Sequence, residues 1–202
     1  MSPAAGVPMP PAPVPVPAAA QDAGPLPRPV DVLVLCTGNA ARSVMAGFML
    51  AHLAEGLGVP LRVATAGTHA VEGQPMSART RAALLGLEAL GELPVGGHRS
   101  RQLDQAGLDR ADLVVAMEAD HVRYVRRRHP QAADRTATVR RLCRDLAPPP
   151  PSLRRRLAAL DLAGVGLGQD EDVPDPAGGD DATYAACAAE LWGLCQALVT
   201  RI

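Results

Sequence analysis

The sequence contains no lysine, few aromatic side chains and no apolar run long enough to cross a bilayer. All 20 basic residues among its 202 are arginines, and 21 acidic residues nearly balance them, which gives a net charge of -1. Because affinity for nucleic acid or an anionic membrane comes largely from excess positive charge, this balance argues against either as a general partner. One Trp, two Tyr and one Phe mean that the core must be mainly aliphatic.

Paired cysteines are also lacking. The four cysteines include no Cys-x-x-Cys pair, so they indicate neither a disulfide framework nor a zinc site, and we expect a reducing, cytoplasmic location. The length suits one domain on the rough scale of about 100 to 200 residues.

Two segments break the pattern of a folded domain. The first 30 residues hold 10 of the 20 prolines, so we expect 1–29 to be a disordered Pro/Ala-rich tail, either solvated or a PxxP-type ligand for a partner. The tail lacks the positive start of a secretion signal. A second Pro-, Arg- and Gly-rich stretch at about 145–168 is interpreted as an insertion or mobile loop. The domain proper is therefore predicted over 30–202.

Short β-branched runs alternate with longer segments of helical period, which predicts an α/β fold built on a parallel sheet. The predicted strands are 30–36, 61–66, 113–117 and 137–142. The predicted helices are 42 to about 56–60, 75–90, 118–128, and a last one from about 181. In that last helix one apolar stripe indicates a buried face: Tyr184, Cys187, Leu191, Cys195 and Leu198.

The strongest functional pattern follows the first predicted strand. Cys36 is separated by five residues from Arg42, which opens the next helix. Backbone amides and the positive end of a helix dipole meet there, so a loop of this length can surround a tetrahedral anion. We expect Gly38 to supply a conformation barred to other residues, and Arg42 to hold two oxygens of the anion. The same field favours the Cys36 thiolate, a nucleophile that Ser43 can support by a hydrogen bond.

This loop, with the segments that follow it, resembles the low-molecular-weight protein tyrosine phosphatase family. Residues 64–68 and 98–103 resemble the family's segment after the second strand and its His-x-x-Arg-Gln-Leu stretch. Residues 112–117 resemble its third strand, and Asp175, between two prolines, matches its general-acid loop. The resemblance covers about 30–144 and 169–202.

The resemblance implies a single flavodoxin-like domain, with a four-stranded parallel sheet and helices on both faces. It implies a two-step phosphatase without metal or cofactor, in which Cys36 attacks phosphorus, Arg42 stabilises the charge and Asp175 protonates the leaving group. Asn39 matches the strained loop residue, and His98 the supporting histidine. The anion would lie against the loop residues: Thr37, Gly38, Asn39, Ala40, Ala41 and Arg42.

The resemblance also implies a substrate, a phosphotyrosine protein, and a partner tyrosine kinase. However, Ala177 and Gly178 stand where many members carry aromatic side chains after the Asp-Pro pair, which weakens the case for strong phosphotyrosine selectivity. Two alternatives stay open: an arsenate reductase of the same fold, and an inactive phosphoprotein-binding module.

Overall fold

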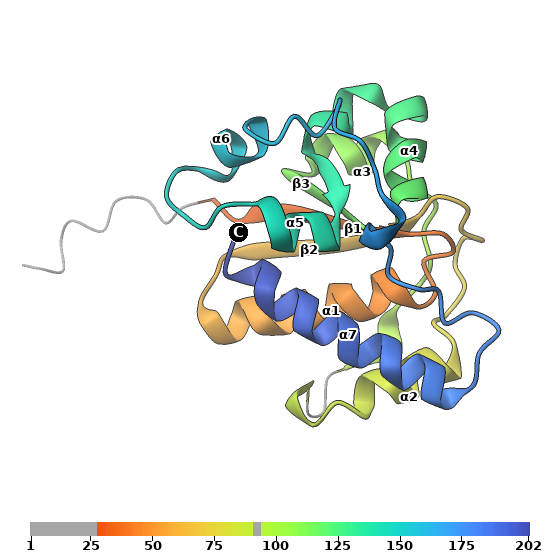
Figure 1. Cartoon of the computed structure of the whole chain (residues 1–202). Helices are drawn as coiled ribbons and strands as arrows, with labels where there is room; N and C mark the ends of the chain where they lie inside the picture. Colours follow the sequence, from red (N-terminus) through yellow and green to blue (C-terminus); the bar gives the residue numbers. More distant parts are fainter. Residues whose placement is uncertain (1–27, 91–93) are drawn as a thin grey trace, which may run out of the picture.

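The structure is a computed structural model that describes residues 28–90 and 94–202, so the predicted tail lies outside it except for Arg28 and Pro29. Four parallel strands form one sheet in the order β2-β1-β3-β4 (Figure 1). The strands are β1 (Val30–Cys36), β2 (Leu61–Gly67), β3 (Leu113–Ala116) and β4 (Thr136–Thr138). The helices are α1 (Arg42–Leu57), α2 (Ala78–Leu85), α3 (Gln105–Arg110), α4 (Ala119–Arg128), α5 (Val139–Asp145), α6 (Leu153–Ala158) and α7 (Asp181–Val199). The predicted fold class is confirmed.

Alternation along β1 divides the core between the two faces of the sheet. Val32 and Val34 point into the larger cluster, which includes side chains of α1, α5 and α7. Leu33 and Leu35 point into the smaller cluster, with side chains from α3 and α4. Helices α1 and α7 lie side by side below the sheet in Figure 1. The predicted apolar stripe of α7 is buried, so burial accounts for both of its cysteines.

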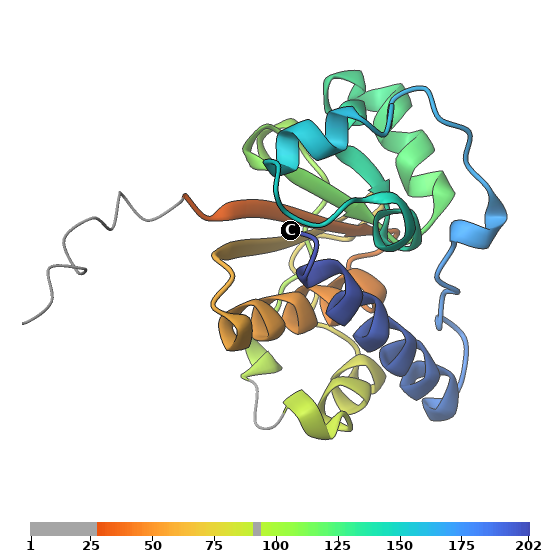
Figure 2. The same cartoon turned by 60° about the vertical axis from the view of Figure 1, so that its left-hand side comes forward.

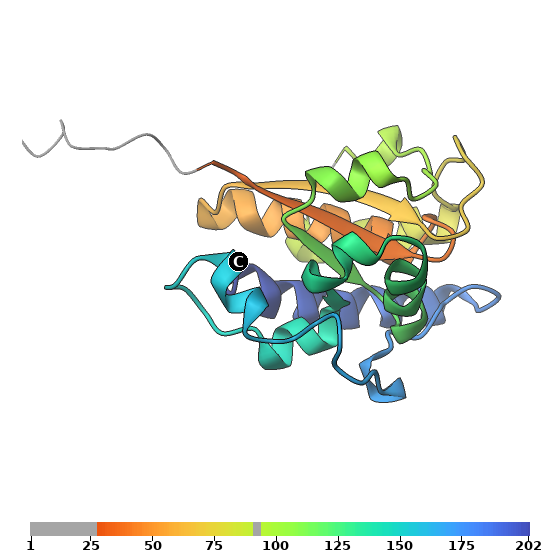
Figure 3. The ribbon, with the colours of Figure 1, turned by 90° about the horizontal axis from the view of Figure 1, so that it is seen from above.

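Figure 3 shows the strands pointing toward one end of the sheet. The loop after β1 and the segment before α7 meet at this end, where the backbone of Val173 bonds to that of Met117, next to β3. The fold thus brings together residues more than 130 positions apart in the chain, such as Arg42 and Val173.

Two predicted elements were wrong in type or extent. The fourth strand, predicted over 137–142, covers only Thr136–Thr138. Helix α5 follows at once because the Thr138 hydroxyl accepts the Arg141 N–H and caps it. The helix predicted over 75–90 is shorter, since Ser77 caps α2 and the helix ends at Gly86; a separate 3-10 turn covers Glu88–Leu90.

The predicted insertion at 145–168 contains helix α6, which packs beside the turn that leads into β4 (Figure 2). The buried Arg156 guanidinium donates to backbone carbonyls near the start of this region and just after α7, including Ala147 at 2.7 Å and Ile202 at 3.2 Å. In residues 28–90 and 94–202, no helix is long and apolar enough to cross a membrane.

Candidate active site

The loop between β1 and α1 lies at the carboxyl end of the sheet, as the sequence predicts. The residue before α1, Ala41, has no side chain that could cap the first helical N–H groups. The first-turn amides of α1 therefore keep their capacity to bind an anion at the positive end of the helix dipole.

Asn39, rather than Gly38, carries the unusual backbone conformation of this loop. Asn39 has φ of 50° and is fully buried, whereas Gly38 does not adopt a positive φ. The expectation for Gly38 was wrong because the Asn39 side chain compensates for the strain at its own position. The side-chain Nδ2 of Asn39 donates to Ser43 Oγ at 3.0 Å, and its side-chain Oδ1 accepts the backbone N–H of Arg101 at 2.9 Å.

Cys36 and Ser43 lie in direct contact. The Cys36 sulfur is 2.9 Å from Ser43 Oγ, and both residues are buried. Because Ser43 Oγ already accepts the N–H of Asn39, its own proton is free to point at the sulfur. This orientation places a donor on a thiolate, the form that acts as a nucleophile.

His98 supports the loop from behind. Its Nε2 lies 2.9 Å from the Asn39 carbonyl oxygen, which can only accept, so Nε2 carries the proton. Burial lowers the pKa of His98, which favours its neutral imidazole. The hydroxyl of the buried Thr80 donates to the next carbonyl, that of Ala40, at 2.9 Å.

The end of β2 presses against the same loop. The amides of Thr68 and His69 donate to the carbonyls of Cys36 and Thr37, both at 2.9 Å. A Cβ added at Gly67 would lie 2.5 Å from the Thr37 carbonyl oxygen and 2.9 Å from the Asn39 nitrogen. Only glycine allows the two backbones to approach so closely.

Arg42 is 1% exposed and is held between two carboxylates. One terminal nitrogen donates to Glu118 and, at 2.9 Å, to the Val173 carbonyl oxygen; the other donates to Asp175 Oδ2 at 2.6 Å. The structure therefore brings Asp175, from the segment before α7, to Arg42 at the end of the loop that begins at Cys36. Asp175 is the most exposed of the Arg42 partners, at 41% of its side chain.

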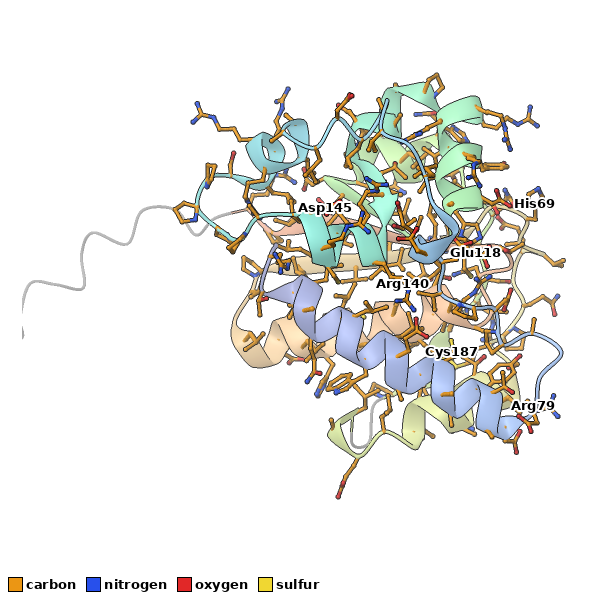
Figure 4. The ribbon with its side chains drawn as sticks, viewed as in Figure 1. His69, Arg79, Glu118, Arg140, Asp145 and Cys187 are labelled. Atoms are coloured by element: carbon orange, nitrogen blue, oxygen red, sulfur yellow. The ribbon has the colours of Figure 1, made fainter. Side chains whose placement is uncertain are left out.

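Glu118 and His121 are members of this site that the sequence reasoning missed. Glu118 follows β3 and appears near the same end of the sheet as His69 in Figure 4. His121, in the first turn of α4, is 3% exposed and contacts Thr37 Oγ1 at 3.0 Å. Burial, reinforced by the Arg42 charge, lowers the pKa of His121 to about 4. Their positions just after the third predicted strand were the only available signal.

The other three cysteines lie on helices α5 and α7, and the Cys187 sulfur is 3.9 Å from the carbonyl oxygen of Pro174, the residue before Asp175. Cys187, labelled on α7 in Figure 4, is buried, and desolvation raises the pKa of its thiol to about 12. Cys143 belongs to α5. Among the residues that the structure describes, no group of three or more His, Cys, Asp or Glu side chains is arranged to hold a metal ion.

A parallel α/β sheet with a cysteine and an arginine on the loop after its first strand defines a class of proteins built around a cysteine-centred anion loop. Residues 31–147 match the model of one such family, described as low molecular weight phosphotyrosine protein phosphatase. The chain belongs to this family.

Two curated relatives differ in the substrate that their names give. The chain is 31% identical to a protein-arginine-phosphatase of Geobacillus stearothermophilus over 177 residues, 86% of this chain and 97% of the relative. It is 34% identical to a low molecular weight protein-tyrosine-phosphatase of Streptomyces coelicolor over 163 residues, 77% and 83% of the two chains. A solved low molecular weight protein tyrosine phosphatase from T. tengcongensis is 28% identical, with a TM-score of 0.68 over 86% of this chain and 99% of that one.

Proposed function

We propose that the protein removes phosphate from phosphorylated side chains of proteins through a cysteinyl-phosphate intermediate. The Cys36 thiolate attacks phosphorus in line and the bond to the leaving group breaks, while loop amides and Arg42 stabilise the charge on the equatorial oxygens. Asp175 protonates the leaving atom and then activates the water that releases phosphate. The observation that carries this proposal is the Arg42–Asp175 contact at 2.6 Å beside the Cys36 loop.

The paired state of Arg42 suggests how substrate binding prepares the acid. Arg42 already donates to Glu118, Val173 and Asp175. A bound phosphoryl dianion takes over the nitrogen that Asp175 occupies, because a dianion attracts the guanidinium more strongly than one carboxylate does. Asp175 is then free to receive a proton and to face the leaving group.

Phosphotyrosine is the first substrate that we propose, with a tyrosine kinase as one partner. The family and the relative from Streptomyces coelicolor support it. An aryl phosphate also suits this loop because the Cys36 sulfur is buried. The side chain of phosphotyrosine is long enough to bring its phosphorus to that sulfur, whereas the side chain of phosphoserine is shorter.

Phosphoarginine is the second candidate. The relative from Geobacillus stearothermophilus, matched over 97% of its length, is named for this substrate. The rim supports it too: Ala177 and Gly178, beside Asp175, offer no ring surface for tyrosine, and the Glu118 carboxylate, which binds Arg42 through Oε1, has a second oxygen whose negative charge suits a guanidinium.

The test is metal-free phosphate release from para-nitrophenyl phosphate and from phosphotyrosine and phosphoarginine peptides. Cys36→Ser should abolish turnover, and Asp175→Asn should reduce it by about 10²- to 10⁴-fold. Asp170→Asn is the matched control, since its exposed carboxylate precedes the acid loop and, within the part of the chain that the structure describes, pairs with Arg144 at 3.7 Å and with no group of the site; it should keep full activity.

Failure of all three substrates would reject the phosphatase proposal. Thiol-dependent arsenate reduction would then identify a reductase, and phosphate binding without turnover would identify a binding module. Equal activity of Asp175→Asn and Asp170→Asn would remove Asp175 from the acid's role.

A further inference from the structure

The Thr37–His121 contact has no role in the mechanism proposed above. Thr37 is the loop residue after the nucleophile and is exposed, whereas its partner His121 is 3% exposed. A buried imidazole that holds the hydroxyl of an exposed threonine fixes a side chain that would otherwise rotate freely at the mouth of the loop.

The hydrogen bonds determine the direction of this contact. The Glu118 N–H donates to His121 Nδ1 at 3.1 Å, so Nδ1 is the unprotonated nitrogen. Nε2 therefore carries the proton and donates it to Thr37 Oγ1 at 3.0 Å. A hydroxyl that accepts one hydrogen bond keeps its own proton and one more lone pair for a further partner.

The contacts also locate the hydroxyl relative to the reacting groups. His121 Nε2 lies 3.7 Å from Glu118 Oε2, while Oε1 of the same carboxylate binds Arg42. Thr37 Oγ1 is thus on the Glu118 side of the anion loop. The Thr37 carbonyl accepts the His69 N–H, which fixes the backbone that carries this side chain.

We infer that Thr37, positioned by His121, is a specificity-determining residue that contacts the leaving group and favours a guanidine over an aryl group. A guanidine presents N–H donors next to the phosphorus that it carries, and the free lone pair of Thr37 Oγ1 accepts one of them. The ring carbons of phosphotyrosine offer no such donor, so the same hydroxyl lies unpaired against the ring. This inference rests on the proposed function and selects phosphoarginine from its two candidate substrates.

The test compares kcat/KM for a phosphoarginine peptide with kcat/KM for a phosphotyrosine peptide of the same sequence. Thr37 also contributes backbone to the anion loop, so a substitution there can lower both kcat/KM values. The ratio of the two values is therefore compared, because an equal effect on both peptides cancels in it. Thr37→Val should lower that ratio about tenfold, and Thr37→Ser, which keeps the hydroxyl, should restore most of it. His121→Leu should lower the ratio in the same direction, and adding it to Thr37→Val should change little more.

Each outcome has a separate meaning. A uniform fall for both peptides, or no fall, would overturn the inference, because Thr37 would then support only the loop. Wild-type activity on phosphotyrosine without activity on phosphoarginine would overturn the inference and leave the phosphatase proposal standing. Inactivity of the wild type on both peptides and on para-nitrophenyl phosphate would reject both.

Discussion

Burial of His121 predicts a loss of stability on acidification that can be assigned to one side chain. Burial lowers the pKa of His121 from 6.5 to about 4 in the folded protein, whereas the unfolded chain keeps the ordinary value. Between these two values the unfolded state binds more protons, so stability rises with pH across the window and is lost as pH falls through it. The difference corresponds to about 3 kcal/mol in total, of which about 2 kcal/mol is lost by pH 5.

The measurement is urea unfolding of the wild type and His121→Gln at several pH values from about 7.5 to 5. Glutamine is polar but does not titrate, so the stability advantage of the wild type over His121→Gln should shrink by about 2 kcal/mol across this range. The control is the same measurement on His69→Gln, which removes an exposed imidazole. It shows how much the pH dependence of stability changes when a histidine is removed from the surface.

An advantage of the wild type that stays constant with pH would refute the reasoning. In that case protonated His121 would find a compensating partner in the folded state, and Glu118 Oε2, 3.7 Å from His121 Nε2, is the group to test. A Glu118→Gln background would then restore the pH dependence.

Three further predictions follow from single contacts. Gly67→Ala should abolish phosphatase activity on para-nitrophenyl phosphate, since its Cβ would meet the Thr37 carbonyl oxygen at 2.5 Å. Glu171→Gln should lower the free energy of unfolding by about 3 kcal/mol or more, because it leaves the Arg141 guanidinium without its buried ionic partner; thermal unfolding measures it. Iodoacetate should alkylate Cys36 with protection by inorganic phosphate, and should leave the fully buried Cys195 unmodified by mass spectrometry until the protein unfolds.

Local patterns were sufficient for the elements that bury a continuous apolar run. Val30–Cys36 was predicted with the bounds that the structure has, because its buried residues form one continuous apolar run that ends at a loop. The run Ala137–Leu142 misled for a related reason. Ala137 and Val139 alternate with Thr138 as in a strand, yet Thr138 caps a helix there and Val139 and Leu142 are buried from one helical face.

The loop residues were predictable because their chemistry lies within eight consecutive positions, Cys36 to Ser43. Glu118 and His121 belong to the same site through the parallel pairing of β1 with β3, which sets the end of β3 beside Cys36. Nothing near residue 118 in the sequence signals that pairing. A carboxylate and an imidazole after a strand are common, and only the register determines that they meet Arg42 and Thr37.

Hydrogen bonds from several segments hold the anion loop in its strained shape. Asn39 keeps its φ of 50° because His98 binds its backbone carbonyl oxygen and the Arg101 N–H binds its side-chain oxygen. Arg42 is held by groups that follow β3 and by groups that precede α7. A strained loop persists only when its surroundings determine it from several directions. Each of these supports comes from a different segment, so the loop can keep its shape while a substrate displaces Asp175, the most exposed of the Arg42 partners.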